Sequence, residues 1–240
     1  MKKLVCLLTA AVLAAALCSC SSSSSSEKQT ESRSRTQSAS QANYRVSNQF
    51  VHAYKYGSET KCCAVVEVTN TGDADIDLAD INFNFTDASG KPVEVNAMKK
   101  TAPLVTKPGK KGYFYVDASE AFLSANANIN DGVKIKPEVT VKATSLKVHD
   151  FPVANDKMKV GEDGSVTVTG TVRNDLDSQR NVVVAVLFHD SVGKVVAVAD
   201  DYTLPEIAAG EKADFEVSTP KESSREIAER IRSYTVIACG

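Results

Sequence analysis

The chain has 240 residues and a formal net charge of −2 at pH 7. It lacks the basic excess that forms an electrostatic footprint for nucleic acid, so we expect no nucleic-acid partner. Tryptophan is absent and aromatic residues make up only 6% of the chain, which argues against a carbohydrate-binding platform built on exposed rings.

The amino terminus has the order of a secretory signal peptide. Residues 1–3 include two lysines, and residues 4–17 form an almost unbroken apolar run. A basic start, an apolar stretch and a small residue before the cut predict a signal peptide over residues 1–19. The run is shorter than the roughly 20 residues of a membrane span, so an uncleaved anchor is the weaker alternative.

Residues 17–20, with the sequence LCSC, resemble the bacterial lipobox. The resemblance implies that Cys20 is lipidated and becomes the mature amino terminus. Cys18 is a rival site, but Leu17 would then stand where a small residue is needed. Two acyl chains of the palmitate type anchor a protein stably, at about 0.8 kcal/mol per buried CH₂. The expected location is therefore the cell membrane, with the protein lipid-anchored and facing outside the cytoplasm.

Residues 20–43 contain no apolar period. Residues 21–26 are all serine, and residues 27–42 are rich in Ser, Gln, Thr and Arg. This composition cannot offset the entropy lost in forming a packed core. It predicts a disordered tether between the lipid and the folded part, with a glycosylated or wall-binding stalk as the alternative.

Three cysteines remain in the expected mature fold, namely Cys62, Cys63 and Cys239. An odd number leaves at least one thiol without an internal partner. Adjacent residues on a strand point to opposite faces, so no bond between Cys62 and Cys63 is expected. We expect buried free thiols, and a disulfide from Cys239 to one of the other two is the alternative.

The folded part contains the same pattern twice, over residues 65–95 and residues 168–198. At one constant offset, the pairs that match are Phe85 and Phe188, Asp87 and Asp190, Gly90 and Gly193, and Lys91 and Lys194. A repeat of about 100 residues marks a duplicated domain, because solenoid units span 20–50 residues. We predict one domain over residues 44–142 and a second over residues 143–240.

Each copy has the pattern of short strands. Ile81, Phe83 and Phe85 alternate with polar residues, as in a strand with one buried face. A turn follows at residues 87–90, and residues 92–95 are predicted to return as the partner strand. Strands separated by turns every 8–12 residues or so indicate a β-sandwich.

Two segments could form helices, residues 119–125 and residues 222–232. In the second segment, Ile227 and Ile231 are spaced to share one helical face. The predicted fold is therefore all-β, with two tandem immunoglobulin-like β-sandwich domains after a signal peptide and a disordered Ser-rich linker.

The strand-and-turn segments at residues 83–87 (FNFTD) and 186–190 (VLFHD) resemble the FxLYD-type immunoglobulin-like modules of bacterial lipoproteins. Phe83 and Asp87 match the motif literally in the first copy, and Asp190 in the second. The resemblance implies an extracytoplasmic β-sandwich. Such modules have no defined catalytic residues, so it implies no site residue.

The two copies differ on one strand face. The first copy places Asn82 and Asn84 there, whereas the second has Val183, Ala185 and Leu187. The second strand is thus apolar on both faces and must be covered. Our preferred cover is the helix at residues 222–232, and the alternatives are the first copy or a partner protein.

The connection between the copies contains hardly any Gly or Ser. Residues 134–142 are predicted to form the last strand of the first copy, and residues 141–151 continue the alternation. We therefore expect a near-continuous strand between the copies and limited hinge motion.

No pattern of a catalytic or metal site is present. His52, His149 and His189 have no ligand partner at a recognised spacing. The acidic run that begins at Asp73 fails the EF-hand pattern, since Leu78 stands where glycine is required. Asp87 and Asp190 precede turns, where such side chains accept hydrogen bonds from their own loop. We expect no catalytic residue, no metal and no cofactor.

The sequence therefore predicts that the protein is not an enzyme. It predicts a membrane-anchored lipoprotein that acts as a binding or structural module at the bacterial cell surface, with a protein or other envelope component as partner. The alternative is a sensor or delivery lipoprotein that binds a metal or a small ligand. Fold resemblance cannot choose between them, because function depends on the site.

Overall fold

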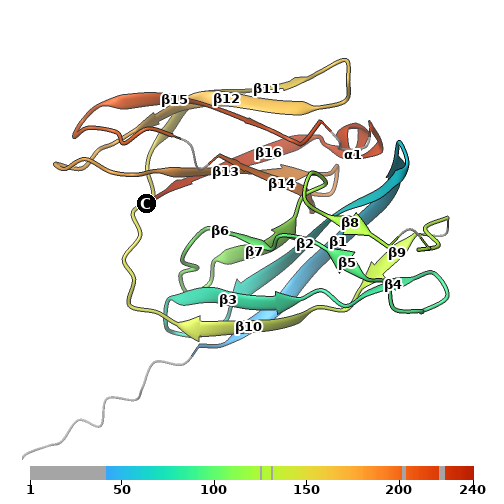
Figure 1. Cartoon of the computed structure of the whole chain (residues 1–240). Helices are drawn as coiled ribbons and strands as arrows, with labels where there is room; N and C mark the ends of the chain where they lie inside the picture. Colours follow the sequence, from blue (N-terminus) through green and yellow to red (C-terminus); the bar gives the residue numbers. More distant parts are fainter. Residues whose placement is uncertain (1–41, 125, 131, 202–203, 222–224) are drawn as a thin grey trace, which may run out of the picture. The chain divides into compact units, whose positions relative to one another are not determined.

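A computed structural model describes residues 42–240 except residues 125, 131, 202–203 and 222–224 (Figure 1). The described chain is all-β, as predicted, and contains one short helix, α1 (Arg225–Arg230). The predicted signal peptide, Cys20 and all but the last two residues of the tether lie outside the described residues. The described residues belong to one compact unit, so the division into two tandem domains stays a prediction.

The first half of the body, residues 42–143, contains two layers of antiparallel sheet. Long strand β2 is paired with β1 on one side and with β7 and β8 on the other, and β5 and β6 extend this sheet. The second layer consists of the pairs β3–β10 and β4–β9. The strands are β1 (Tyr44–Tyr56), β2 (Glu59–Asn70), β3 (Ile76–Asn82), β4 (Phe85–Asp87), β5 (Val95–Asn96), β6 (Lys100–Ala102), β7 (Lys111–Val116), β8 (Phe122–Leu123), β9 (Val133–Ile135) and β10 (Glu138–Ala143).

The second half, residues 144–240, is built from two three-stranded sheets, β11-β12-β15 and β14-β13-β16. Helix α1 lies between β15 and β16 in the chain. The strands are β11 (Val153–Val160), β12 (Val166–Arg173), β13 (Val183–His189), β14 (Val195–Asp201), β15 (Lys212–Ser218) and β16 (Ser233–Cys239).

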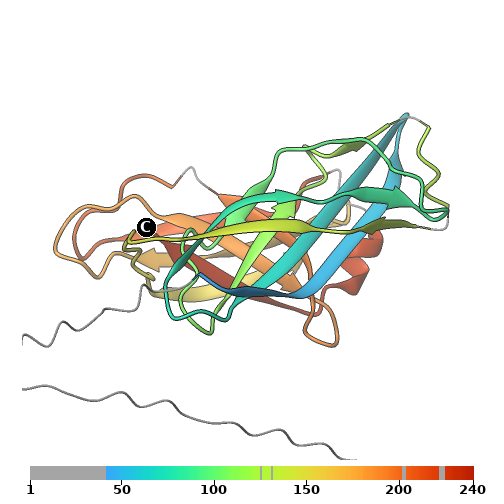
Figure 2. The same ribbon diagram turned by 90° about the horizontal axis from the view of Figure 1, so that it is seen from below.

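The four sheet layers stack on one another, with the β1-β2-β7 sheet and the β14-β13-β16 sheet in the middle (Figure 1). Seen from below, β1 and β2 run across the direction of β16 (Figure 2). Three hydrophobic clusters fill the spaces between the layers, one inside each half and one between the halves. The two halves are therefore joined through sheet faces and not end to end.

Strand β2 shows why the stack forms. Nine consecutive residues of this strand, Thr60–Val68, are buried, which is typical of a strand covered on both faces. Ala64 and Val66 point into the core of the first half, whereas Cys63 belongs to the core of the second half and Val65 to the cluster between them.

We call the cluster between the halves the seam. It contains Val65, Ala102, Tyr113, Tyr115, Ala185, Leu187, Val195 and Val198. The apolar face that the sequence places at residues 183–187 is therefore covered, but the preferred cover was wrong. The sheet of the first half covers Ala185 and Leu187, while α1 packs its Ile227 into the core on the other side of β13.

The duplicated pattern reappears as duplicated hydrogen bonding. The Asn70 side-chain amide donates to the carbonyl oxygens of Ala74 and Thr106 at 2.8 and 2.9 Å. The Asn174 amide donates to those of Ser178 and Ile207, both at 2.8 Å. Both asparagines are fully buried, and each side chain joins two segments of its half through these hydrogen bonds, as a buried amide group requires.

One of the two predicted helices is present and the other is not. The helix in the second half is confirmed over Arg225–Arg230, with Ile227 buried. The helix predicted over residues 119–125 is wrong. The Asp117 carboxylate accepts the Ser119 backbone N–H at 2.9 Å and closes a turn, and Phe122 in β8 then pairs with Lys61 of β2. So short a segment gains little as an isolated helix, and the sheet edge satisfies its backbone instead.

The near-continuous strand between the halves is also wrong. Strand β10 ends at Ala143, and residues 144–149 form no strand. The alternation of Val139 and Val141 is real, because both half-buried side chains pack against the core of the first half. After Ala143 the chain has to pass from the outermost layer of the first half to the second half (Figure 1), so it cannot stay in one sheet.

Candidate functional site

The two halves begin the same β-hairpin in the same way. Asp87 Oδ1 accepts the backbone N–H groups of Ser89 and Lys91, both at 2.9 Å, and the Asp87 N–H donates to the Lys91 carbonyl. In the second half, Asp190 Oδ1 accepts those of Val192 and Lys194 at 3.0 and 2.9 Å. This confirms that both carboxylates serve their own turns.

The turns also influence the acidity of the two carboxyl groups. The hydrogen bond from the Ser89 hydroxyl, followed by that from the Lys91 backbone, lowers the pKa of Asp87. The Lys194 backbone hydrogen bond, followed by that from Val192, lowers the pKa of Asp190. Both side chains therefore favour the charged form, as hydrogen bonds to a carboxylate require.

After this common start the hairpins diverge. In the second half, β14 stays paired with β13 along its whole length. In the first half, the segment after the turn is bridged to β4 through Thr86 and Pro92, and the Val93 N–H donates to the Phe85 carbonyl. Beyond Val93 this segment is no longer paired with β4. Val95 pairs with Leu123 of β8 instead. The return strand predicted at residues 92–95 is therefore wrong beyond its first rung.

The divergence begins where the layer opposite is broken. Asn84 has a φ of 45° between β3 and β4, a conformation that asparagine tolerates better than most residues. Across from it, Pro137 separates β9 from β10 and cannot donate to a ladder. The Asn84 side-chain amide donates to the Lys136 carbonyl at 3.1 Å and fixes the break.

The opened hairpin leaves a groove with a volume of about 230 Å³. We call it the hairpin groove. Its walls come from the two arms that would otherwise be paired. They consist of Asn82, Phe83, Asn84 and Phe85 on one arm and Pro92, Val93, Val95, Ala97 and Lys99 on the other. The aromatic walls are buried in the core, while Met98, between two lining residues, is 60% exposed.

A charged network closes one side of the seam. Lys100 Nζ lies 3.0 Å from Asp117 Oδ2, 3.3 Å from Glu120 Oε2 and 3.5 Å from Asp200 Oδ1. The Tyr115 hydroxyl donates to Asp200 Oδ1 at 2.7 Å. Burial alone lowers the pKa of Lys100, but the Asp117 hydrogen bond and the three carboxylates outweigh it and raise that pKa. The lysine therefore stays charged and joins the halves by electrostatics as well as by packing.

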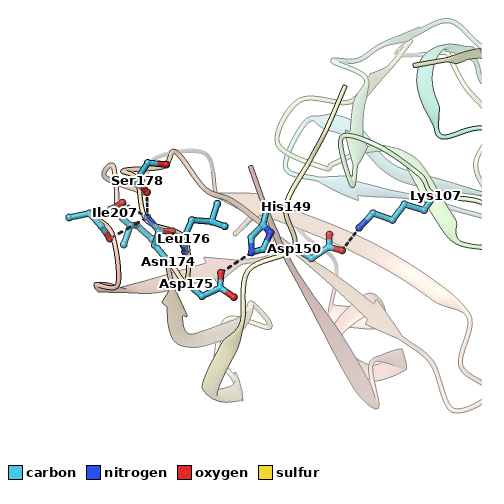
Figure 3. A network of polar contacts seen from close by, with 9 residues as sticks. Lys107, His149, Asp150, Asn174, Asp175, Leu176, Ser178 and Ile207 are labelled. Atoms are coloured by element: carbon cyan, nitrogen blue, oxygen red, sulfur yellow. Dashed lines mark hydrogen bonds and ion pairs between the residues drawn. The ribbon is translucent and has the colours of Figure 1, made fainter. Parts of the chain in front are cut away.

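The segment that connects the halves is bonded to the first half through Asp150 and to the second half through His149 (Figure 3). Lys107 of the first half donates to Asp150 at 2.6 Å. His149 Nε2 lies 2.7 Å from Asp175 Oδ1, beside the loop that Asn174 organises. The hydrogen bond to Asp150 raises the pKa of Lys107 above its ordinary value. These exposed pairs fix the path of the connection, and each contributes little on its own.

All three described cysteines are free and buried, which confirms the expectation. Cys62 faces the core of the first half, while Cys63 faces that of the second. Burial raises the pKa of Cys62 to about 12 and raises that of Cys63 as well. Neutral thiols in apolar surroundings are poor nucleophiles, and these two act as small packing residues.

The histidines occupy separate places. His52 Nε2 lies 3.5 Å from Glu226 Oε2, and burial lowers the pKa of His52. His189 Nε2 lies 3.0 Å from the Thr235 hydroxyl. In the described part of the chain, no group of three or more His, Cys, Asp or Glu side chains is arranged to hold a metal ion. The acidic run from Asp73 to Asp80 contributes one ion pair to the surface near the groove, between Asp80 and Lys99 at 3.3 Å.

Sequence reasoning missed the charged network and the hairpin groove. No local pattern connects Lys100 with Asp200, because the two come together only when the halves stack. One residue could have indicated the groove from the sequence. Asn84 stands where the second copy has Leu187, so the strand is less apolar at this position in the first copy. The predicted lipidation residue, Cys20, lies outside the described residues, so the structure does not place it.

Comparisons with protein-family models, with curated protein sequences and with solved structures found no match for this chain. Over residues 42–240, apart from the gaps given above, no helix is long and apolar enough to cross a membrane. Membership in the FxLYD-type group therefore stays an expectation that depends on residues 83–87 and 186–190.

Proposed function

We propose that this protein is a membrane-anchored, extracytoplasmic lipoprotein that acts without catalysis as a binding or structural module at the bacterial cell surface. The observation that carries the proposal is the lipobox-like LCSC sequence at residues 17–20, followed by a Ser-rich stretch and an all-β body. A lipid on Cys20 holds the body at the membrane, and the tether gives it reach.

The stacked body supports this role. The seam buries large side chains of both halves against each other, including Tyr115 and Leu187. The two halves then present one rigid surface to a partner, with little entropy lost to hinge motion on binding. The resemblance of residues 83–87 and 186–190 to FxLYD-type modules supports the same assignment.

Mass spectrometry of the mature amino terminus tests the anchor. We expect a diacylglyceryl thioether on Cys20 and recovery of the protein with the membrane fraction. The variant Cys20→Ala should keep the signal peptide, while the matched control Cys18→Ala should be processed and lipidated normally. An unmodified, full-length chain in the cytosol would contradict the proposal.

Elemental analysis of the purified chain tests the binding class. We expect no stoichiometric calcium, zinc or copper. A metal bound at one ion per chain would contradict a metal-free binding module and would favour a sensor or delivery protein.

A further inference from the structure

We propose that the hairpin groove binds an extended peptide segment of a partner protein, which adds as a β-strand beside β3. This inference rests on the proposed function, since it names the surface with which the anchored module binds. The segment has small aliphatic side chains at alternate positions. The argument comes from the second half, where the same position is already filled.

The second half shows what fits beside the matching strand. There β14, with the sequence VVAVADD, pairs antiparallel with β13 over Val184–His189. Its Val196, Ala197 and Ala199 reach the core, while Val195 and Val198 face the seam. Because the two hairpins share their turn and first rung, an extended segment of the same chemistry suits the position that the first half leaves open.

The edge of β3 lacks a strand partner on the groove side. Among the described strands, β3 is paired with β10 alone. Its first residue, Ile76, is bridged to Thr106, and β4 is bridged to Pro92 through Thr86. The stretch of edge without a strand partner is therefore residues 77–82 of β3.

One backbone N–H group of this stretch is satisfied locally by a neighbouring side chain, since the Ile81 N–H donates to Asp80 Oδ1 at 2.8 Å. At the break that follows β3, the Asn84 N–H donates to Asn82 Oδ1 at 3.4 Å, while the Asn84 carbonyl accepts from the Lys136 N–H.

Such local bonds can be exchanged for ladder bonds at low cost. Side-chain to backbone hydrogen bonds of Asp and Asn compete with sheet pairing and substitute for it. Here Asp80 and Asn82 are both exposed, so water solvates their side chains once a strand takes over the backbone groups. Strand addition of this kind derives affinity from main-chain bonds and specificity from pockets for alternate side chains.

The size and mouth of the groove limit how a peptide can bind. A volume of about 230 Å³ is below the roughly 300–1,000 Å³ of small-ligand pockets, so the groove takes only inward-facing side chains of the segment, while its backbone lies along the edge of β3. The Asp80–Lys99 pair at the mouth is exposed on both sides, so opening it costs little. Met98 is exposed beside it, and methionine adapts its shape to an incoming apolar surface.

The test uses the full-length lipidated chain in detergent micelles and a synthetic peptide with the β14 sequence and its preceding lysine, KVVAVADD. Hydrogen–deuterium exchange followed by mass spectrometry locates the bound peptide. We expect exchange at residues 77–85 and 92–99 to slow about threefold when the peptide concentration is about twice its Kd. The peptide KVVPVADD should give no protection, since proline breaks the ladder.

Two protein variants accompany the peptides. Ala97→Phe fills the groove and should abolish the protection, while the control Val192→Phe, at the exposed tip of the other hairpin, should leave it unchanged. Circular dichroism shows whether each variant keeps its fold. If Ala97→Phe unfolds, Met98→Asp replaces it, and we expect at least a severalfold weaker peptide affinity because the mouth loses its apolar side chain.

Three results would overturn the inference. The first is no protection anywhere at millimolar peptide. The second is protection at residues 184–201, which would mean that the peptide only displaces β14. The third is a concentration-dependent dimer of the chain alone that Ala97→Phe abolishes, which would make a second copy the occupant. A chain that carries lipid on Cys20 but binds no peptide would leave the proposed function standing, whereas an unlipidated chain would remove it whatever the peptide does.

Discussion

The two halves of the body share their local chemistry and differ in what the matching strands β3 and β13 face. Asn70 and Asn174 make equivalent hydrogen bonds, and Asp87 and Asp190 close equivalent turns. Yet β13 is buried on both faces, whereas β3 alternates between buried and exposed residues. The hydrogen bonds of Asp87 and Asp190 therefore specify the turn of each hairpin. The residues on the face of β3 or β13 that points away from the core of its own half decide whether that face packs against the other half.

The same contrast explains why only one hairpin is open. Leu187 continues β13 and packs in the seam, while Asn84, at the matching place, adopts a left-handed conformation and interrupts the layer. The apolar-to-polar differences on this face thus accompany two changes, loss of cover and loss of pairing. The face of β13 is therefore covered by the other half, whereas the matching face of β3 stays exposed.

The largest expected effect comes from placing a charge in the seam. Leu187→Asp should lower the free energy of unfolding by about 4 kcal/mol, since an unpaired buried carboxylate belongs to the most damaging class of substitutions. The matched control is Asn82→Asp on the corresponding face of β3, which should change it by less than about 0.5 kcal/mol because the site is exposed and Asp keeps the acceptor oxygen. Urea denaturation measures both. An unchanged stability of Leu187→Asp would mean that this face is free.

A somewhat smaller loss is expected at the charged network. Lys100→Met leaves Asp117 and Asp200 buried without their cation and should cost about 3 kcal/mol. Lys99→Met removes the exposed pair with Asp80 and should cost less than about 1 kcal/mol. Thermal unfolding of both variants separates the two. Equal losses would show that the network contributes no more than a surface pair.

The buried asparagines should behave alike in the two halves. Asn70→Ala and Asn174→Ala each remove the side-chain hydrogen bonds that join two turns, while the Thr106 and Ile207 carbonyls keep one backbone donor each. Each substitution should cost about 1–2 kcal/mol. Chemical denaturation measures the pair. A loss in one variant without a similar loss in the other would contradict the equivalence of the two turns.

One substitution should stabilise the first half. The Thr106 hydroxyl is buried and has no hydrogen-bond partner among the described residues, and the second half has Ile207 at the matching bridge. Thr106→Val removes the unsatisfied group and should raise the free energy of unfolding by about 0.5–1 kcal/mol. The reverse exchange, Ile207→Thr, should lower the melting temperature. A destabilised Thr106→Val variant would reveal a role for the hydroxyl.

The smallest effect concerns acid stability. Hydrogen bonds in the turns lower the folded-state pKa of Asp87 and Asp190. Their contribution is present above the unfolded value of about 3.9 and is lost as the pH falls through the folded pKa. Stability measured from pH 5 downward should therefore fall less steeply in Asp87→Asn and Asp190→Asn. A slope identical to that of the unchanged chain would contradict the shifts.

The sequence predicted the elements that depend on local chemistry. The alternation at Ile81–Phe85, the turns at Asp87 and Asp190, the free thiols and the amphipathic helix around Ile227 all follow from rules of short range. Three features depended on contacts between segments far apart in the chain and were missed. These are the seam over Leu187, the network around Lys100, and the loss of pairing after Pro92.

The misses have a common physical cause. An apolar strand face shows that a cover exists but not which element supplies it. The pattern at residues 183–187 therefore could not choose between helix α1 and the sheet of the first half. The groove depends on Asn84 and Pro137 meeting across two strands. Each residue alone is compatible with a strand edge.

The claim that the seam joins both halves into one rigid body is tested most directly by differential scanning calorimetry of the full-length chain. The account predicts one cooperative transition, with calorimetric and van't Hoff enthalpies that agree. Two separate transitions in the unchanged chain, one for each half, would contradict it.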